Sequence, residues 1–293
     1  MTDFNFGSWQ VSAAPACGGN LSKVCWRGND IMRAFYDVKE WEAAPTNYGF
    51  AVLFPPNRID NGVFDFEGKR YSLPVNEAVR GNHLHGIALR EAWELTEVTD
   101  NSLCMQFIYD ERHSMFSGFP FKCKMSVVYT FSENSLEQRF IVENLSETNM
   151  PCALGFHSAF AMPKKLNVHG VGERIELLPP RYLATGRNVP WTDGFEPNVQ
   201  CNPAEVWPFG HLKAAEEPSA ELEYDNFSVK YLPDRKFGYF MVWRKDDEFD
   251  YICVEPMNIK IGTFENAPET LPVLRAGEKE CFVSKVEITG DVL

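Results

Sequence analysis

The feature that most constrains the fold is a run of four alternating segments between residues 92 and 142. Apolar and polar side chains alternate with a period of two in each segment, which is typical of a β-strand with one buried face. Clusters of Asn, Asp, Ser and Glu separate the segments, and none carries the stripe of an amphipathic helix. We therefore expect an antiparallel meander. Its strands are predicted at residues 92–98, 103–109, 124–131 and 136–142.

The rest of the chain repeats this pattern in shorter pieces, separated by turn residues. Residues 163–220 are the exception, because eight prolines interrupt them, and we expect long loops over the sheets there. The sequence as a whole predicts an all-β fold, a large single-domain antiparallel β-sandwich over residues 1–293. The further strands are predicted at residues 9–13, 21–26, 48–54, 62–68, 70–73, 222–231, 239–243, 251–254 and 282–288.

Charge and composition restrict the partners of the chain. Its 28 basic and 41 acidic residues give a net charge of −13, and no block of five basic residues occurs, so a nucleic-acid partner is not expected. No apolar run approaches the length of a membrane span, and the first residues lack the features of a signal peptide. The eight cysteines are scattered without a C-x-x-C pair, which is typical of reduced thiols. We expect a cytoplasmic protein, a monomer or homodimer, without membrane attachment.

Two histidines near the first third of the chain, His83 and His85, admit three interpretations. As strand residues i and i+2 they share one face, so they could bind a metal ion together with Glu91 and His157, as in a cupin-like barrel. Alternatively, both only hydrogen-bond to the backbone of a loop. In the third interpretation, His85 alone contacts a substrate.

Two later positions could supply an acid/base pair. Glu255 follows the apolar run 251–254, where a carboxylate is expected only if it is paired or faces a pocket. His157 stands among small and aromatic residues at 154–160. A buried structural histidine and a solvated glutamate at a strand end are the alternatives. If the fold closes the two around one small polar substrate, they form a general acid/base pair.

Several motifs occur together, in order, along almost the whole chain. Together they resemble the aldose 1-epimerase family, the galactose-mutarotase-like proteins. The motifs are Asn57-Arg58-Ile59, a Gly-x-Phe-x-x-x-Gly-x-x-Tyr-x-Leu pattern from Gly62 to Leu73, Asn76, Leu84-His85-Gly86, Gly155-x-His157, Asp225-Asn226-Phe227, Val254-Glu255-Pro256 and the segment from Pro272 to Glu278.

This resemblance implies a galactose mutarotase-like supersandwich and an enzyme that interconverts the α and β anomers of a hexose or related aldose, with no metal and no cofactor. It implies that His157 is the general acid and Glu255 the general base. Arg58, His85 and Asp225 match positions that hold the sugar.

The chain also departs from the family pattern. Ile87 stands where many members have a second glycine, and Ala159 stands where an aromatic residue often follows the histidine. Both positions alter the wall of the pocket, which indicates a divergent branch with its own sugar. His83 matches no functional position of the family.

The residue types suit the chemistry that the resemblance implies. A glutamate with a pKa of about 4.3 is ionised at neutral pH, and an imidazole with a pKa of about 6.5 can carry a proton, so both are expected to start in their working states. Two relatives of this function remain as alternatives. One is a carbohydrate-binding protein without turnover, and the other is an enzyme specific for sugar phosphates. In the second case a cationic pocket would draw on Arg58, Arg80, Arg90 and Arg181.

Overall fold

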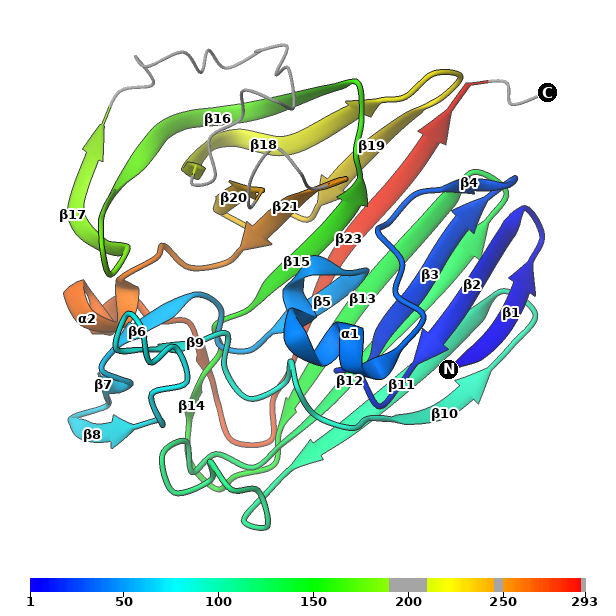
Figure 1. Ribbon diagram of the computed structural model, residues 1–293. Coiled ribbons are helices and arrows are strands. Elements are labelled where there is room, and N and C mark those ends of the chain that lie inside the picture. The colour runs from blue at the N-terminus through cyan, green and yellow to red at the C-terminus, as the bar shows by residue number, and fades with distance from the viewer. Residues whose placement is uncertain (190–209, 245–249, 291–293) are drawn as a thin grey trace.

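A large antiparallel sheet runs through the computed structural model, which describes residues 1–189, 210–244 and 250–290 (Figure 1). Eleven of its thirteen strands form one hydrogen-bonded path, and the last two extend from β18. The path is β10 (Glu94–Val98), β11 (Ser102–Tyr109), β12 (Cys123–Ser132), β13 (Ser135–Asn144), β23 (Lys279–Thr289), β19 (Ser228–Pro233), β18 (Gly210–Glu223), β20 (Tyr239–Trp243), β21 (Tyr251–Met257), β15 (Gly155–Ala161) and β5 (Phe50–Leu53). Off this path, β16 (Lys165–Leu178) pairs with β18 and β17 (Leu183–Val189).

A four-stranded sheet at the N-terminus lies against the β11–β13 end of the large sheet (Figure 1). The two sheets are joined by indole hydrogen bonds. Trp9 Nε1 donates to the Ser132 carbonyl at 2.7 Å, and Trp26 Nε1 donates to the Glu133 carbonyl at 2.9 Å. Both indoles are fully buried, so each contributes apolar area to the core and also satisfies its one polar atom. The strands are β1 (Thr2–Phe6), β2 (Trp9–Ala14), β3 (Asn20–Trp26) and β4 (Asn29–Asp30).

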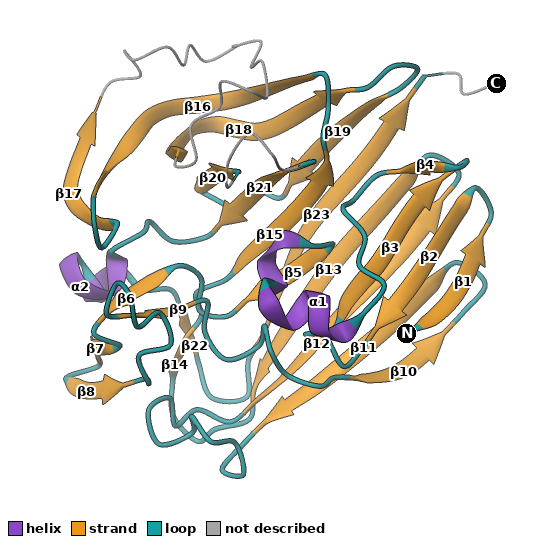
Figure 2. Cartoon of the chain, in the orientation of Figure 1, coloured by secondary structure: helices purple, strands orange, loops and turns teal. Residues whose placement is uncertain are grey.

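Short elements complete the described fold (Figure 2). Three small two-stranded antiparallel sheets are β6 (Arg58–Asp60) with β9 (Asn82–Leu84), β7 (Val63–Phe66) with β8 (Lys69–Ser72), and β14 (Met150–Pro151) with β22 (Val273–Leu274). The helical pieces are α1 (Val38–Ala43), α2 (Thr263–Asn266) and the 3₁₀ turns Pro45–Asn47 and Pro268–Thr270. None of these helical pieces is long or apolar enough to span a membrane.

The β5–β15 end of the large sheet folds back over its middle strands. Phe54, just after β5, contacts Phe140 of β13 with ring centroids 6.0 Å apart, and both rings are fully buried. The Phe50 carbonyl of β5 accepts from the Gln138 side chain at 3.2 Å. One hydrophobic cluster therefore extends from the N-terminal sheet to this fold-back. The prediction of an all-β, antiparallel sandwich is confirmed.

Residues 163–220 differ from the sequence-based expectation of loops. The described part of this segment is mostly strand, in the long elements β16, β17 and β18 (Figure 1). Pro179 and Pro180 fall between β16 and β17, and Pro218 lies in β18 beside a shift in register between His169 and Val171. A bulge of this kind removes the need for the amide hydrogen that proline lacks. Pro190, Pro197, Pro203 and Pro208 lie outside the described residues.

The fold-back predicts a large stability loss for Phe140→Ala. Removing a fully buried aromatic ring between two layers leaves a cavity, and the expected decrease in the free energy of unfolding is about 3–5 kcal/mol. Chemical denaturation followed by tryptophan fluorescence measures it. Ile108→Ala on β11 is the control, because Ile108 is 53% exposed and its change should stay within about 0.5 kcal/mol. Equal losses for the two variants would contradict this account of the core.

Candidate active site

Three neighbouring strands, β15, β21 and β20, separate a core face from a pocket face. Their even-numbered residues, such as Phe156 and Val254, join the main hydrophobic cluster. Because side chains alternate along a strand, the odd-numbered residues point to the other face. His157, Met241 and Glu255 are on that face and line a cavity of about 210 Å³.

The pairing register of β15 and β21 brings the two predicted catalytic residues together. Gly155 pairs with Met257 and Ser158 with Val254, which places His157 opposite Glu255 on the adjacent strand. His157 Nε2 lies 3.1 Å from Glu255 Oε1, and the two side chains are only 5% and 4% exposed. Directly opposed side chains on neighbouring strands are held by the backbone ladder, so little side-chain motion is needed to keep this contact.

Burial changes the protonation expected for this pair. It lowers the pKa of His157 to about 3 and raises the pKa of Glu255 well above its ordinary value, while the nearby Arg58 guanidinium acts in the opposite direction on Glu255. Each group is therefore shifted toward its neutral form. The expectation that both residues start in their charged working states is corrected, because it used the pKa values of exposed groups.

Arg58 and His85, two of the predicted sugar-holding residues, line the same cavity as the acid/base pair. Its lining also includes aromatic, apolar and amide side chains, so it offers both flat surfaces and hydrogen-bond donors. At about 210 Å³ it suits a ligand smaller than a typical drug molecule. The lining consists of Thr46, Asn57, Arg58, Glu77, Arg80, Leu84, His85, His157, Met241, Trp243 and Glu255.

Glu77 organises one side of the cavity. Its carboxylate accepts two hydrogen bonds from Arg58, at 2.9 Å each, and one from Arg80 at 2.8 Å. A fourth comes from the Asn82 amide at 2.9 Å. These donors lower the pKa of Glu77 despite its burial, so the carboxylate is ionised at neutral pH. The bidentate pairing fixes the guanidinium plane of Arg58 at the pocket wall.

A sharp turn at His85 and Gly86 places an imidazole against the pair. Both residues have positive φ, 67° and 70°. A Cβ atom on Gly86 would lie 2.1 Å from the Phe54 carbonyl oxygen, so the backbones approach here as only glycine allows. The His85 ring meets the His157 ring edge-on with centroids 5.6 Å apart, and burial lowers its pKa well below the ordinary range. His85 therefore lines the cavity as a neutral imidazole.

Asp225 lies elsewhere, which corrects its predicted place among the sugar-holding residues. It sits in the turn between β18 and β19, is largely exposed, and forms an ion pair with Lys164. It lines a separate cavity together with Asn29 and Tyr224. The neighbouring residue explains this position. The Tyr224 hydroxyl donates to the carbonyl of Ala161, the last residue of β15, and this end of β15 lies away from the pocket.

The four ligands of the cupin-like alternative do not converge. His83 Nδ1 is 2.8 Å from the Pro74 carbonyl, so this ring is engaged by the backbone beside β9. Glu91 pairs instead with His113, whose Nε2 lies 3.0 Å from its carboxylate. Among the described residues no group of three or more His, Cys, Asp or Glu side chains is placed to hold a metal ion.

Sequence reasoning did not single out Glu77 and Trp243 as pocket residues. Glu77 is three positions before Arg80, a spacing that suggests a local ion pair, but its main partner Arg58 is nineteen positions away. Only the pairing of β6 with β9 brings these segments together. Trp243 ends an ordinary apolar strand, and its position next to His157, with ring centroids 5.9 Å apart, follows from sheet order.

Comparison with known proteins identifies the family of the chain. The model of the aldose 1-epimerase family matches residues 11–196, more than half of the chain. The chain belongs to the aldose 1-epimerase family. Membership supports an isomerase of the epimerase kind. Two curated relatives from Escherichia coli K12 are uncharacterized proteins. YihR is 29% identical over 140 residues, which cover 47% of this chain and 43% of YihR. YphB is 22% identical over 184 residues, which cover 63% of this chain and 60% of YphB. Each alignment spans less than two thirds of the relative's length.

Solved structures of family members share the fold. A galactose mutarotase-like protein from Clostridium acetobutylicum superposes with a TM-score of 0.88 at 24% identity, covering 99% of this chain and 95% of that one. A galactose 1-epimerase from Lactobacillus acidophilus gives a TM-score of 0.78 at 12% identity, with coverages of 98% and 93%. The predicted galactose mutarotase-like fold is confirmed.

Burial of Glu255 predicts a pH-dependent gain in stability for Glu255→Gln. The unfolded carboxyl ionises above about pH 4.5, whereas the folded one stays protonated to a higher pH, so the wild-type protein loses stability as the pH rises above that value. Glutamine ionises in neither state. The variant should therefore melt a few degrees above the wild type at pH 7, with the difference shrinking toward pH 4.5.

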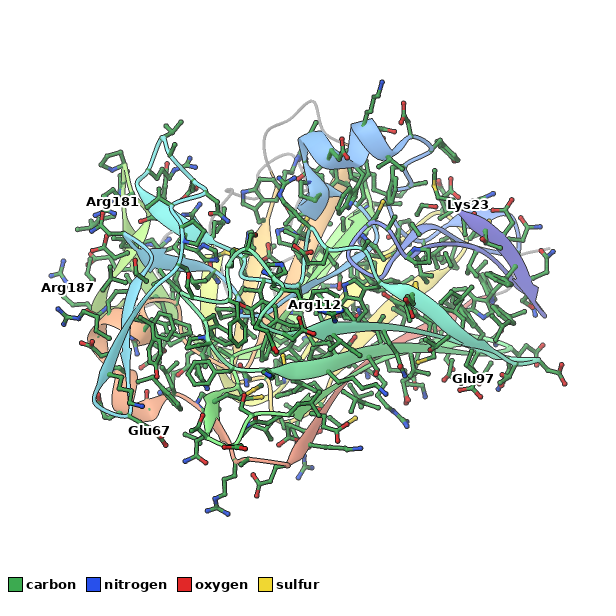
Figure 3. The ribbon with its side chains drawn as sticks, turned by 90° about the horizontal axis from the view of Figure 1, so that it is seen from below. Lys23, Glu67, Glu97, Arg112, Arg181 and Arg187 are labelled. Carbon is green, nitrogen blue, oxygen red and sulfur yellow. The ribbon has the colours of Figure 1, made fainter. Side chains whose placement is uncertain are left out.

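Thermal melts across this pH range measure the effect. Glu97→Gln is the control, because Glu97 is an exposed residue of β10 and should shift stability by no more than about 0.5 kcal/mol. Figure 3 shows Glu97 at one side of the molecule and Arg181 at the other. A difference for Glu255→Gln that is absent at pH 7, or that grows on acidification, would contradict the burial argument.

Proposed function

We propose that this protein is an aldose 1-epimerase, a mutarotase that interconverts the α and β anomers of a pyranose sugar. The observation that supports this most is the His157–Glu255 contact of 3.1 Å on the wall of a small cavity that Arg58 and His85 also line. Anomer exchange needs two proton-transfer groups within reach of two oxygens on the same carbon, the C1 hydroxyl and the ring oxygen. A carboxyl and an imidazole in contact meet that requirement.

The pair holds one proton in two arrangements. In one, Glu255 carries it and His157 is neutral, which is the arrangement that burial favours. In the other, Glu255 is a carboxylate and His157 an imidazolium, which the Arg58 charge and the hydroxyl groups of an entering sugar favour. The two arrangements differ only in the position of one proton across a single hydrogen bond.

Ring opening starts from the charged arrangement. Glu255 accepts the proton of the C1 hydroxyl, the C1–O5 bond breaks, and His157 donates its proton to O5. The products are an open-chain aldehyde and a neutral pair, which is the arrangement favoured by burial. Rotation about C1–C2 presents the other face of the carbonyl, and the same transfers in reverse close the ring as the opposite anomer. Protons and electrons balance over the cycle.

Arg58 and His85 orient the sugar in this scheme. Arg58 is held by Glu77, so the N–H groups that it does not use in that pairing have fixed directions. His85 offers a neutral ring next to His157. Holding the sugar in a reactive position supplies a large part of such a catalytic effect.

Substitution of the pair tests the proposal. Glu255→Gln and His157→Ala should each lower the enzymatic rate of anomer exchange by about 10²–10⁴-fold, because each removes one proton-transfer group. Polarimetry or NMR exchange measures the rate with freshly dissolved α-anomers of a panel of common aldoses and uronic acids. Wild-type speed in either variant would overturn the assignment.

A second histidine–glutamate contact in the same chain provides a matched control. His113→Ala and Glu91→Gln remove the groups of the His113–Glu91 pair, which lies outside the cavity lining and should leave the rate within about twofold of the wild type. The cupin-like alternative makes the opposite prediction, since Glu91 is one of its metal ligands. Loss of activity in Glu91→Gln with full activity in Glu255→Gln would favour that alternative.

A further inference from the structure

The charged groups of the cavity do not balance. Arg58 and Arg80 both line it, and Glu77 is the carboxylate that both contact. The His157–Glu255 pair has no net charge when one proton is shared across its 3.1 Å contact, and burial lowers the pKa of His85 well below its ordinary range. Among the described lining residues, two guanidinium groups thus face one negative charge. The cavity carries a net charge of about +1 in a protein whose total charge is −13.

Arg80 has N–H groups that are available to bind a ligand. A guanidinium has five N–H groups. Arg58 uses two on Glu77, whereas Arg80 uses one, through Nη1, and its guanidinium makes no other hydrogen bond to a described residue. Its side chain is 34% exposed, against 10% for Arg58. Arg80 can therefore donate to a ligand without breaking an existing pair.

Neighbouring groups keep Arg80 in place. The Tyr182 ring lies under its guanidinium, 5.0 Å from Cζ to the ring centroid. Arg181 donates to the Arg80 and Gly81 carbonyls, both at 2.8 Å, and its own charge is paired with Asp60. Figure 3 shows Arg181 beside the cyan loop between β8 and β9. Arg181 therefore anchors the Arg80 backbone, and the free positive charge at the pocket belongs to Arg80.

We infer that the substrate is an aldose that carries one negative charge on a carbon other than C1, and that Arg80 binds this charge. The inference rests on the proposed function, because the pair must still act on the anomeric carbon. A guanidinium with several free N–H groups forms paired hydrogen bonds to the two or three oxygens of a carboxylate or sulfonate. A neutral sugar would bring no negative charge to Arg80, whose remaining N–H groups would then bond only to hydroxyl groups or water.

The net charge of the cavity distinguishes among anions of different charge. A phosphate monoester carries a charge of about −1.5 to −2 at pH 7, whereas a carboxylate or a sulfonate carries −1. The single uncompensated guanidinium matches the smaller charge. Arg90 lies outside the cavity lining, and its Nη1 donates to the Glu42 carbonyl, so it is not placed to bind the same anion directly. The substrate class that fits best is thus a sugar acid or a sulfonated sugar.

Anomer-exchange kinetics on matched sugars test the inference. The panel is glucose, glucuronate, 6-deoxy-6-sulfoglucose and glucose 6-phosphate, with galactose and galacturonate as a second series. We expect kcat/KM for at least one monoanionic sugar to exceed that of its neutral parent by tenfold or more. We also expect that sugar to exceed the phosphate. Added salt should reduce the advantage, because it screens a partly exposed charge.

Arg80→Gln keeps a polar side chain but removes the charge, so it should bring the ratio of anionic to neutral kcat/KM close to one. The change should come mainly from a higher KM for the anionic sugar. Arg112→Gln is the control. Arg112, labelled in Figure 3, is an exposed arginine paired with Asp110 and lies outside the cavity lining. It should leave the ratio at the wild-type value.

The outcomes separate the two proposals. If no sugar shows enzymatic exchange, the proposed function itself fails. If neutral sugars react as well as the anionic ones, or if Arg80→Gln lowers both equally, the function stands and the inference is wrong. A preference for the phosphate over both monoanions would overturn the single-charge assignment. A thermal melt of Arg80→Gln shows whether the variant is folded. Arg80→Lys keeps the positive charge but lacks the bidentate geometry of a guanidinium, so it should retain part of the ratio of anionic to neutral kcat/KM.

Discussion

The contact between His157 and Glu255 is the interaction on which the rest of the site depends. It exists because β15 and β21 are neighbours in a register that sets the two residues opposite each other, with the hydrophobic core directly behind them. Burial on this scale is unfavourable for any charged group. In the proposed mechanism, one shared proton lets the pair stay neutral at rest and become charged only when a sugar supplies hydrogen bonds. The fold thus creates both the proximity and the energetic bias that the chemistry uses.

The strands were predictable wherever one face of a sheet meets the core and the other meets solvent. Alternation located β11, β12 and β13 almost to the residue, because a side-chain period of two is a direct result of strand geometry. It failed at β16 and β18. There the prolines suggested loops. Only the partner strands show that Pro218 lies at a bulge, where no inter-strand hydrogen bond from its nitrogen is needed.

The site was predictable only in part. Glu255, after an apolar run, and the motif around His157 pointed to the acid/base pair through resemblance. The link between Arg58 and Glu77 depends on how two distant segments pair, and the position of Asp225 depends on which end of a strand its turn occupies. Protonation was predicted least well, since the pKa shifts of the pair come from burial, which only the packed structure defines.

The two walls of the cavity belong to different parts of the chain. The proposed proton-transfer groups are built into β15 and β21, two adjacent strands near one end of the large sheet, whereas Glu77 and Arg80 stand on a loop beside the small β6–β9 pair. A loop tolerates exchange of residues far better than a buried strand does. Related proteins can therefore come to bind different substrates through substitutions in this loop alone, while the strands that carry the proposed acid/base pair stay unchanged.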